Sequence, residues 1–202
     1  LGLRWELVEF AAMMARAVIG AQIQEELHAR AEQLAGLQLF SRSIATSMSF
    51  SGLLTNTIEG IAELMHAASV LLAFERTVIT PQLLQLLHET PGMRIYQNLM
   101  GISAVTLDEP LALFSRLYRL LMWSIDASQP LFLDPTMPVD SIEDLYYNET
   151  GRALIAPLTI GESPLGVLYI EAPITAPGYD EGDMVVLRTA TNTLAVALQR
   201  AG

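Results

Sequence analysis

The sequence predicts an α+β fold in which an antiparallel sheet is covered on both faces. The main observation is a hairpin at residues 152–172, RALIAPLTIGESPLGVLYIEA, whose two strands are apolar on both sides. A sheet with one face in water would alternate apolar with polar residues, so this one is expected between two layers. Helical patterns at residues 3–47 and 180–201 are expected to cover one face. The least regular part, residues 91–150, is expected to cap the other face with loops and a helix.

Composition restricts the classes of function. The chain has 202 residues, enough for one domain of about 150 residues and an additional segment. Its net charge is −11, from 22 acidic and 11 basic side chains, which disfavours nucleic acid and anionic membranes as partners. The absence of cysteine excludes thiol catalysis, disulfides, thiolate metal sites and a chromophore attached to sulfur. The sequence has neither an apolar run of about 20 residues nor a basic-then-apolar leader, so we expect a cytoplasmic location.

The N-terminal segment predicts a signalling helix that forms a coiled coil. Residues 3–47 lack proline, and from Ile23 the apolar residues are spaced by four and three. The predicted dimer seam consists of Ile23, Leu27, Leu34 and Leu37, continues at Ile44, and includes Arg30 and Ser41. We therefore divide the chain into a coiled-coil helix at 1–36 and a folded domain at 37–202. A long helix of an ordinary helical bundle is the alternative.

A weak internal repeat suggests that the helix at 1–36 ends a preceding module. A shift of 180 residues places the closing helical pattern on the opening one, with identities at Leu7 and Leu187 and at Ala15 and Ala195. The chain also begins at Leu1 rather than Met and stops inside a helical pattern. These features predict a piece cut from a tandem array of similar modules.

The remaining elements follow from local patterns. Residues 49–68 predict a second helix, residues 68–74 a buried strand, residues 130–133 a short strand, and Asp108-Glu109-Pro110 the start of another helix that continues to Ile125. QLLQLLHE, which follows Thr80-Pro81, has leucine spacing that suits a helix, but its surroundings lead us to predict a strand. The closing helix is expected to be capped by Asp180 with Asp183, and Tyr179 to pack on Met184.

Candidate ligand-binding residues cluster in the segment expected to cap the sheet. This segment contains the aromatic residues Tyr96, Tyr118, Trp123, Phe132, Tyr146 and Tyr147. A concave apolar site with a few polar groups is typical of small-molecule pockets, although the same rings could simply fill space. The three histidines, His28, His66 and His88, stand alone without metal-ligand spacing, so no metal site is predicted. His88 is the best candidate for an axial ligand, because it is expected at a strand end that faces the pocket segment.

From about residue 37 to 201 the chain resembles a GAF domain. The resemblance rests on LFSRSIATSMSFSGLL, ASVLLAF, SQPLFLDP, and the combination RALIAPLTIGESPLGVLYIEAP followed by YDEGDMVVLRTATNTLAVALQRA. It implies a six-stranded antiparallel sheet with the opening and closing helices on one face and a small-molecule pocket on the other. It also implies dimerisation through helices and a place in sensor histidine kinases, diguanylate cyclases or phosphodiesterases of two-component and cyclic-di-GMP signalling.

Departures from the family narrow the expected ligand. The cysteine that binds a linear tetrapyrrole and the cysteines of GAF-type methionine sulfoxide reductases are absent. The residue set of cyclic-nucleotide-binding members is also missing. We therefore predict a non-enzymatic sensory domain that binds an unidentified small molecule or partner and signals through a homodimer of N- and C-terminal helices. The alternatives are a structural dimerisation spacer without a ligand and the effector domain of a transcription regulator.

Overall fold

The computed structural model describes residues 2–104, 110–133 and 152–201. The chain consists of two compact units, Leu1–Gln38 and Leu39–Gly202. The first unit belongs to the long helix α1, Gly2–Ala45, which agrees with the helix predicted at 3–47. The second unit contains the last turns of α1 and all the other elements.

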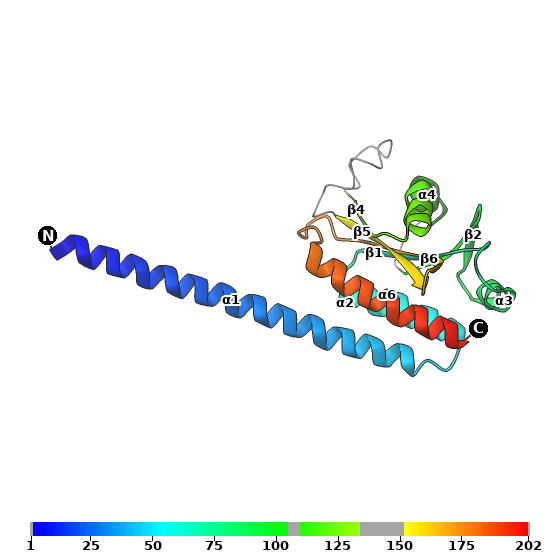
Figure 1. The fold of residues 1–202 in the computed structure, drawn as a ribbon, viewed down its shortest axis with the longest axis horizontal. Coiled ribbons are helices and arrows are strands. Elements are labelled where there is room, and N and C mark those ends of the chain that lie inside the picture. Colours follow the sequence, from blue (N-terminus) through cyan, green and yellow to red (C-terminus); the bar gives the residue numbers. More distant parts are fainter. Residues whose placement is uncertain (1, 105–109, 134–151, 202) are drawn as a thin grey trace. The chain divides into compact units, whose positions relative to one another are not determined.

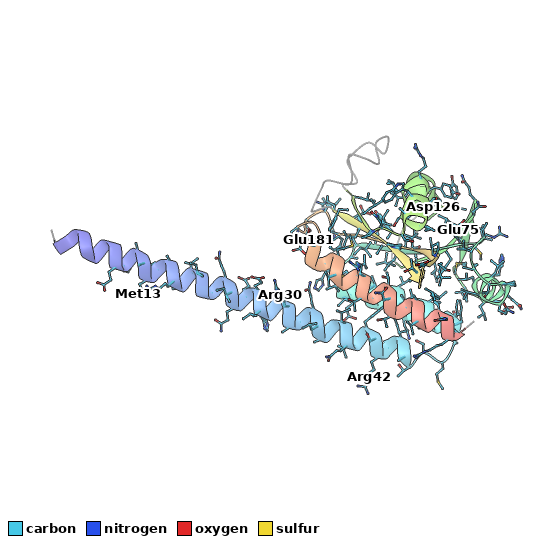
Figure 2. All side chains as sticks on the ribbon, in the orientation of Figure 1. Met13, Arg30, Arg42, Glu75, Asp126 and Glu181 are labelled. Atoms are coloured by element: carbon cyan, nitrogen blue, oxygen red, sulfur yellow. The ribbon has the colours of Figure 1, made fainter. Side chains whose placement is uncertain are left out.

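Helix α1 exposes apolar side chains along its length. Its described exposed apolar residues include Phe10, Met13, Met14, Val18, Ile19, Ile23, Leu27 and Leu34, each more than half exposed (Met13 is labelled in Figure 2). One surface ion pair joins Arg30 Nη2 to Glu26 Oε1 at 2.6 Å, one helical turn apart. Helices with exposed apolar side chains usually bury them against another surface.

The second unit contains both helices and strands. The elements are α2 (Phe50–Leu64), β1 (Ser69–Glu75), α3 (Pro81–Glu89), β2 (Arg94–Tyr96), β3 (Leu99–Ala104), α4 (Pro110–Ala127), β4 (Leu131–Leu133), β5 (Ala153–Ile160), β6 (Ser163–Glu171) and α6 (Glu181–Ala201). The strands form one six-stranded sheet in the order β2-β3-β1-β6-β5-β4, and every pair is antiparallel. This confirms the predicted α+β fold.

The sheet lies between two layers, as the apolar hairpin predicts (Figure 1). We call the side covered by α4 the front face and the side covered by α2 and α6 the back face. Strand alternation places these buried side chains on the back face: Val70, Leu72, Phe74, Leu154, Ala156, Leu158, Leu168 and Ile170. The front face carries a second buried cluster, described below. Both faces of β5 and β6 are therefore apolar because neither meets water.

Glycine allows the two central strands to approach. A Cβ atom at Gly166 would lie 2.1 Å from the carbonyl oxygen of Ala73, which is its neighbour on β1. The β5–β6 turn uses Gly161 with a φ of 62°, a backbone conformation that glycine adopts without strain. The hairpin thus depends on glycine for its turn and for its contact with β1.

The predicted strand at QLLQLLHE is wrong, because these residues form helix α3. Thr80 caps the helix by accepting a 3.2 Å hydrogen bond from the Leu83 backbone N–H, and Pro81 occupies the first turn. Leu83 and Leu87, one turn apart, are both buried. His88 consequently lies in the last turn of a helix rather than at a strand end, and its side chain is exposed.

The start of α6 and the end of α1 follow from local sequence features. Asp180 and Asp183 form a reciprocal cap for α6, in which each backbone N–H donates a 3.0 Å hydrogen bond to the other carboxylate. At the end of α1, Phe40 and Ile44 are buried, and the Phe40 ring packs closely on Gly60 of α2. Ile44 therefore packs inside the second unit and is not available to continue the dimer seam.

No helix in the described ranges is both long and apolar enough to cross a membrane.

Candidate functional site

The candidate site is the front face of the sheet together with α4. Leu117, Leu120, Leu121 and Ile125 of α4 pack against a buried apolar cluster from five strands. We call this set the front cluster; its strand members are Leu71, Ala73, Leu99, Leu131, Leu133, Ala153, Ile155, Val167 and Tyr169. In Figure 2 side chains fill the space between α4 and the sheet. The front cluster is thus a second core, separate from the one under α6.

Three aromatic side chains and one methionine pack against the front cluster, and we call them the aromatic margin. Tyr96, Tyr118, Met122 and Trp123 are partly buried and pack against that cluster. The rings of Tyr96 and Tyr118 meet edge to face, with centroids 5.7 Å apart and planes at 70°. This geometry suits the quadrupoles of two aromatic rings, so β2 is joined to α4 by an oriented contact. The margin combines apolar surface with hydroxyl groups, as small-molecule sites do.

A polar group interrupts the front face at the end of β6. Tyr169 is 1% exposed, and its hydroxyl donates a 2.9 Å hydrogen bond to Glu171 Oε2. The strand register places Ser69 of β1 on one side of Glu171 and Ala153 of β5 on the other. Both neighbours are small and buried, so the half-buried carboxylate of Glu171 lies between two short side chains.

Two acidic groups near this end of the sheet have raised pKa values. Burial raises the pKa of Tyr179 above its usual range, and the carboxylates of Asp183 and Glu171 raise it further. Burial also raises the pKa of Asp183; the Asp180 N–H and His66 act against this effect, whereas the Asp180 carboxylate adds to it. Burial is the largest cause of both shifts, and the neighbouring carboxylates add to it.

The structure brings together three of the predicted pocket residues. Tyr96, Tyr118 and Trp123 all pack against the front cluster, whereas His88 is exposed on α3. Tyr146 and Tyr147 lie outside the described residues. Phe132 is half-buried on β4, on the side opposite to the front-cluster residues Leu131 and Leu133.

Sequence reasoning missed the pair of Tyr169 and Glu171. A signal was present, because Glu171 follows Tyr169 by two residues and strand periodicity puts both on one face. Glu171 is the last residue of β6 and the one carboxylate on the front side of that strand. Within the described ranges, no group of three acidic or histidine side chains could hold a metal ion.

The predicted seam residues differ in exposure. Ile23, Leu27 and Leu34 are between 53% and 63% exposed on α1, and Leu37 is half-buried. Within the second unit, a groove of about 430 Å³ lies between the end of α1 and α6. Its lining includes Ser41, Ile44, Thr189, Asn192, Val196 and Arg200.

Comparisons with known proteins identify the fold. No protein-family model matches the sequence, and no curated protein matches it significantly. Among solved structures, the GAF domain of a phosphoenolpyruvate-protein phosphotransferase from Coxiella burnetii has a TM-score of 0.56 at 16% identity, covering 84% of this chain and 94% of that one.

Two further solved structures share this fold. A free methionine-R-sulfoxide reductase from Neisseria meningitidis, in complex with its substrate, has a TM-score of 0.56 at 13% identity, covering 84% of this chain and 89% of that one. Part of a methyl-accepting chemotaxis protein has a TM-score of 0.54 at 16% identity, covering 80% of this chain and 96% of that one.

The chain has the fold of a GAF domain.

Proposed function

We propose that this GAF-fold chain is a non-enzymatic sensory domain, which binds a small molecule on the front face and relays the event through helices to an output domain of a cytoplasmic signalling protein. The observation that carries the proposal is the front face itself. It combines an apolar cluster, an oriented aromatic margin and a half-buried carboxylate. This is the composition of a small-molecule site rather than of an interior core alone.

The solved structures with this fold support a regulatory role. One is the GAF domain of a phosphoenolpyruvate-protein phosphotransferase, and another is part of a methyl-accepting chemotaxis protein. The methionine sulfoxide reductase shows that the fold also accommodates an enzyme with its substrate. The present chain has no cysteine, so the thiol reduction chemistry expected of a GAF-type reductase has no nucleophile here.

The relay is proposed to run through a homodimer. Ile23, Leu27 and Leu34 expose an apolar stripe at coiled-coil spacing, and a second copy of α1 is the simplest surface to cover it. On α6, Val185 and Val196 are also exposed, and Val196 lines the groove beside the end of α1. A ligand would shift the helical arrangement only by its differential affinity for the two states.

One observation favours a spacer without a ligand. Leu71, Ala73 and Ile155 at the centre of the front face are at most 1% exposed, so α4 already fills this region with protein atoms. In that case the fold would serve only to hold two helices in a dimer. The two functions differ in whether any small molecule stabilises the folded domain.

Thermal unfolding with a metabolite library, together with native mass spectrometry of freshly purified protein, separates these functions. A sensory domain is expected to show saturable stabilisation by at least one compound, because binding to the folded state alone raises stability. Tyr118→Ala should reduce that stabilisation, whereas Arg119→Ala, at the exposed neighbouring position, should leave it unchanged. If no compound stabilises the domain and native mass spectrometry detects no co-purified ligand, the spacer function is established.

A further inference from the structure

The outer face of α6 carries apolar groups that the second unit leaves uncovered. The inner face of this helix is buried against the sheet and α2. On the outer face, Val185 and Val196 are 61% and 48% exposed. The hydroxyls of Thr189 and Thr193 each donate a 2.9 Å hydrogen bond to the backbone carbonyl four residues earlier. With these hydroxyls turned to the backbone, the threonines present methyl groups and make the outer face more apolar.

The exposed residues of this face are arranged symmetrically about the middle of the helix. Six of them form three pairs, each equidistant from the midpoint between Ala190 and Thr191: Glu181 with Arg200, Val185 with Val196, and Thr189 with Asn192. On each side of the midpoint the residues follow at steps of four, so they share one stripe. If two copies of α6 lie antiparallel about a two-fold axis, valine meets valine and acid meets base.

Charge distinguishes the two possible orientations. In the antiparallel pair, Glu181 of each copy lies opposite Arg200 of the other, so both ends attract. In a parallel pair, Glu181 would face Glu181 and Arg200 would face Arg200, so both ends would repel. Like charges placed together across an interface disfavour the wrong arrangement. The antiparallel orientation is therefore favoured.

The groove beside the C-terminal half of α6 favours the same orientation. It has a volume of about 430 Å³, and its apolar lining includes Ile44 of α1 and Val196 and Ala197 of α6. In the antiparallel pair, Val185 of the second copy lies opposite Val196, at this groove. In a parallel pair it would lie opposite Val185, one turn before the groove begins at Thr189. Only the antiparallel pair brings the most exposed valine of α6 to the groove.

The central polar layer also suits the antiparallel pair. Thr189 uses its hydroxyl hydrogen on the carbonyl oxygen of Val185, so its oxygen retains lone pairs that accept. The side-chain amide of Asn192 in the second copy supplies the donor. A polar residue inside an otherwise apolar helix interface fixes its register.

We propose that the outer face of α6 binds the same face of a second copy of this chain, with the two helices antiparallel. Val185 of each copy occupies the groove beside Val196 of the other, and Glu181 pairs with Arg200 at both ends. This inference rests on the homodimer of the proposed function, to which it adds a face outside the α1 seam. One pair of helices is a small contact beside the roughly 1,200–2,000 Å² of stable complexes, so covalent trapping detects it better than mass does.

Cysteine crosslinking tests the orientation in the whole chain, because the native sequence contains no cysteine. Val185→Cys and Val196→Cys are purified separately, mixed in equal amounts and oxidised with copper phenanthroline. A disulfide requires Cβ atoms about 4 Å apart, so the mixture should give a covalent dimer. Either variant alone should give only the level of random collision. A mixture of Val185→Cys with Glu162→Cys, at the exposed β5–β6 turn, sets that level.

Exchange of the end charges tests the register. In the cysteine mixture, Glu181→Arg should lower the initial crosslinking rate by about threefold to tenfold, because both end pairs become repulsive. Adding Arg200→Glu should restore the rate, because the pairs form again with their signs exchanged. This recovery also shows that the loss does not come from misfolding at the start of α6.

Each outcome supports or overturns the interface. Crosslinking of Val185→Cys with itself above the collision level indicates a parallel pair and overturns the orientation. Crosslinking at the collision level in every sample, or no recovery in the charge exchange, overturns the antiparallel interface. These results leave the ligand site and the α1 seam untouched, since thermal unfolding with metabolites and Leu27→Asp with Leu34→Asp test those separately.

Discussion

The hydroxyl of Tyr169 donates a 2.9 Å hydrogen bond to the carboxylate of Glu171, which lies two residues further along β6. This bond links the middle of the front cluster, where Tyr169 is 1% exposed, to the half-buried end of the same strand. The buried hydroxyl thereby gains a charged acceptor, and the carboxylate is held on the front side of the sheet.

The two buried tyrosines are expected to respond in opposite directions to loss of the hydroxyl. Tyr169→Phe removes a donor to Glu171 and should lower the free energy of unfolding by about 1 kcal/mol. Tyr179 is 5% exposed and its hydroxyl has no hydrogen-bond partner among the described residues, so Tyr179→Phe should raise stability by about 1 kcal/mol. Urea unfolding of the two variants measures both effects. A loss of stability in Tyr179→Phe would show that the hydroxyl is satisfied in solution.

Gly166→Ala should strongly destabilise the second unit. The added methyl group would lie 2.1 Å from the carbonyl oxygen of Ala73, so β1 and β6 must separate at the centre of the sheet. We expect a loss of about 3 kcal/mol or more, at the upper end for overpacking. Gly20→Ala is the control, because nothing lies within 4 Å of its Cβ position on α1. Equal melting temperatures for Gly166→Ala and the wild type would contradict the close approach of the strands.

The Asp183 carboxylate should make stability depend on pH. Burial raises the pKa of Asp183 above the ordinary value of about 3.9, and the Asp180 carboxylate contributes in the same direction. The folded state therefore binds this proton more tightly than the unfolded state. The contribution to stability is complete below the ordinary pKa and is lost as the pH rises through the raised one.

Asp183→Asn removes this titration and retains an oxygen that accepts from the Asp180 N–H. The unfolding free energy of the wild type minus that of the variant should therefore decrease as the pH rises from about 3 towards neutrality. Asp126→Asn, at an exposed position of α4 (Figure 2), controls for the loss of one carboxylate. A difference that grows with pH would reverse the assigned sign.

The exposed stripe of α1 should determine the oligomeric state. Leu27→Asp with Leu34→Asp places two charges in the predicted seam and should convert a dimer into a monomer in light scattering. Gln22→Asp with Ala29→Asp adds the same charges at the same spacing on the opposite side of the helix and should leave the mass unchanged. An unchanged mass for the seam variant would reject the seam.

Strong local patterns made much of the fold predictable. The two-faced hairpin and the reciprocal cap of Asp180 and Asp183 follow from strand alternation and from short-range hydrogen bonding. Helix α3 was wrongly predicted as a strand, although its leucine spacing and its Thr80–Pro81 start both favour a helix. Ile44 continues the coiled-coil spacing in sequence but is 4% exposed in the second unit. Spacing alone cannot tell which surface covers a helix.

The candidate site was only partly predictable. Tyr96 and Tyr118 were expected in the capping segment, yet their mutual contact depends on the pairing of β2 with β3, which no local pattern specifies. Glu171 was missed because its importance depends on three strands. Only the register of β1, β6 and β5 places it between Ser69 and Ala153.

The most direct test of a ligand site on the front face is methyl NMR during titration with a compound that raises the melting temperature in the thermal screen. Methyl groups of Leu71, Leu121 and Ile155 report on the front cluster, and those of Leu72, Leu154 and Leu187 report on the back layer. Our account predicts saturable shifts that are largest in the front set and reduced in Tyr118→Ala. Shifts centred on the back set, or equal shifts in Tyr118→Ala, would contradict it.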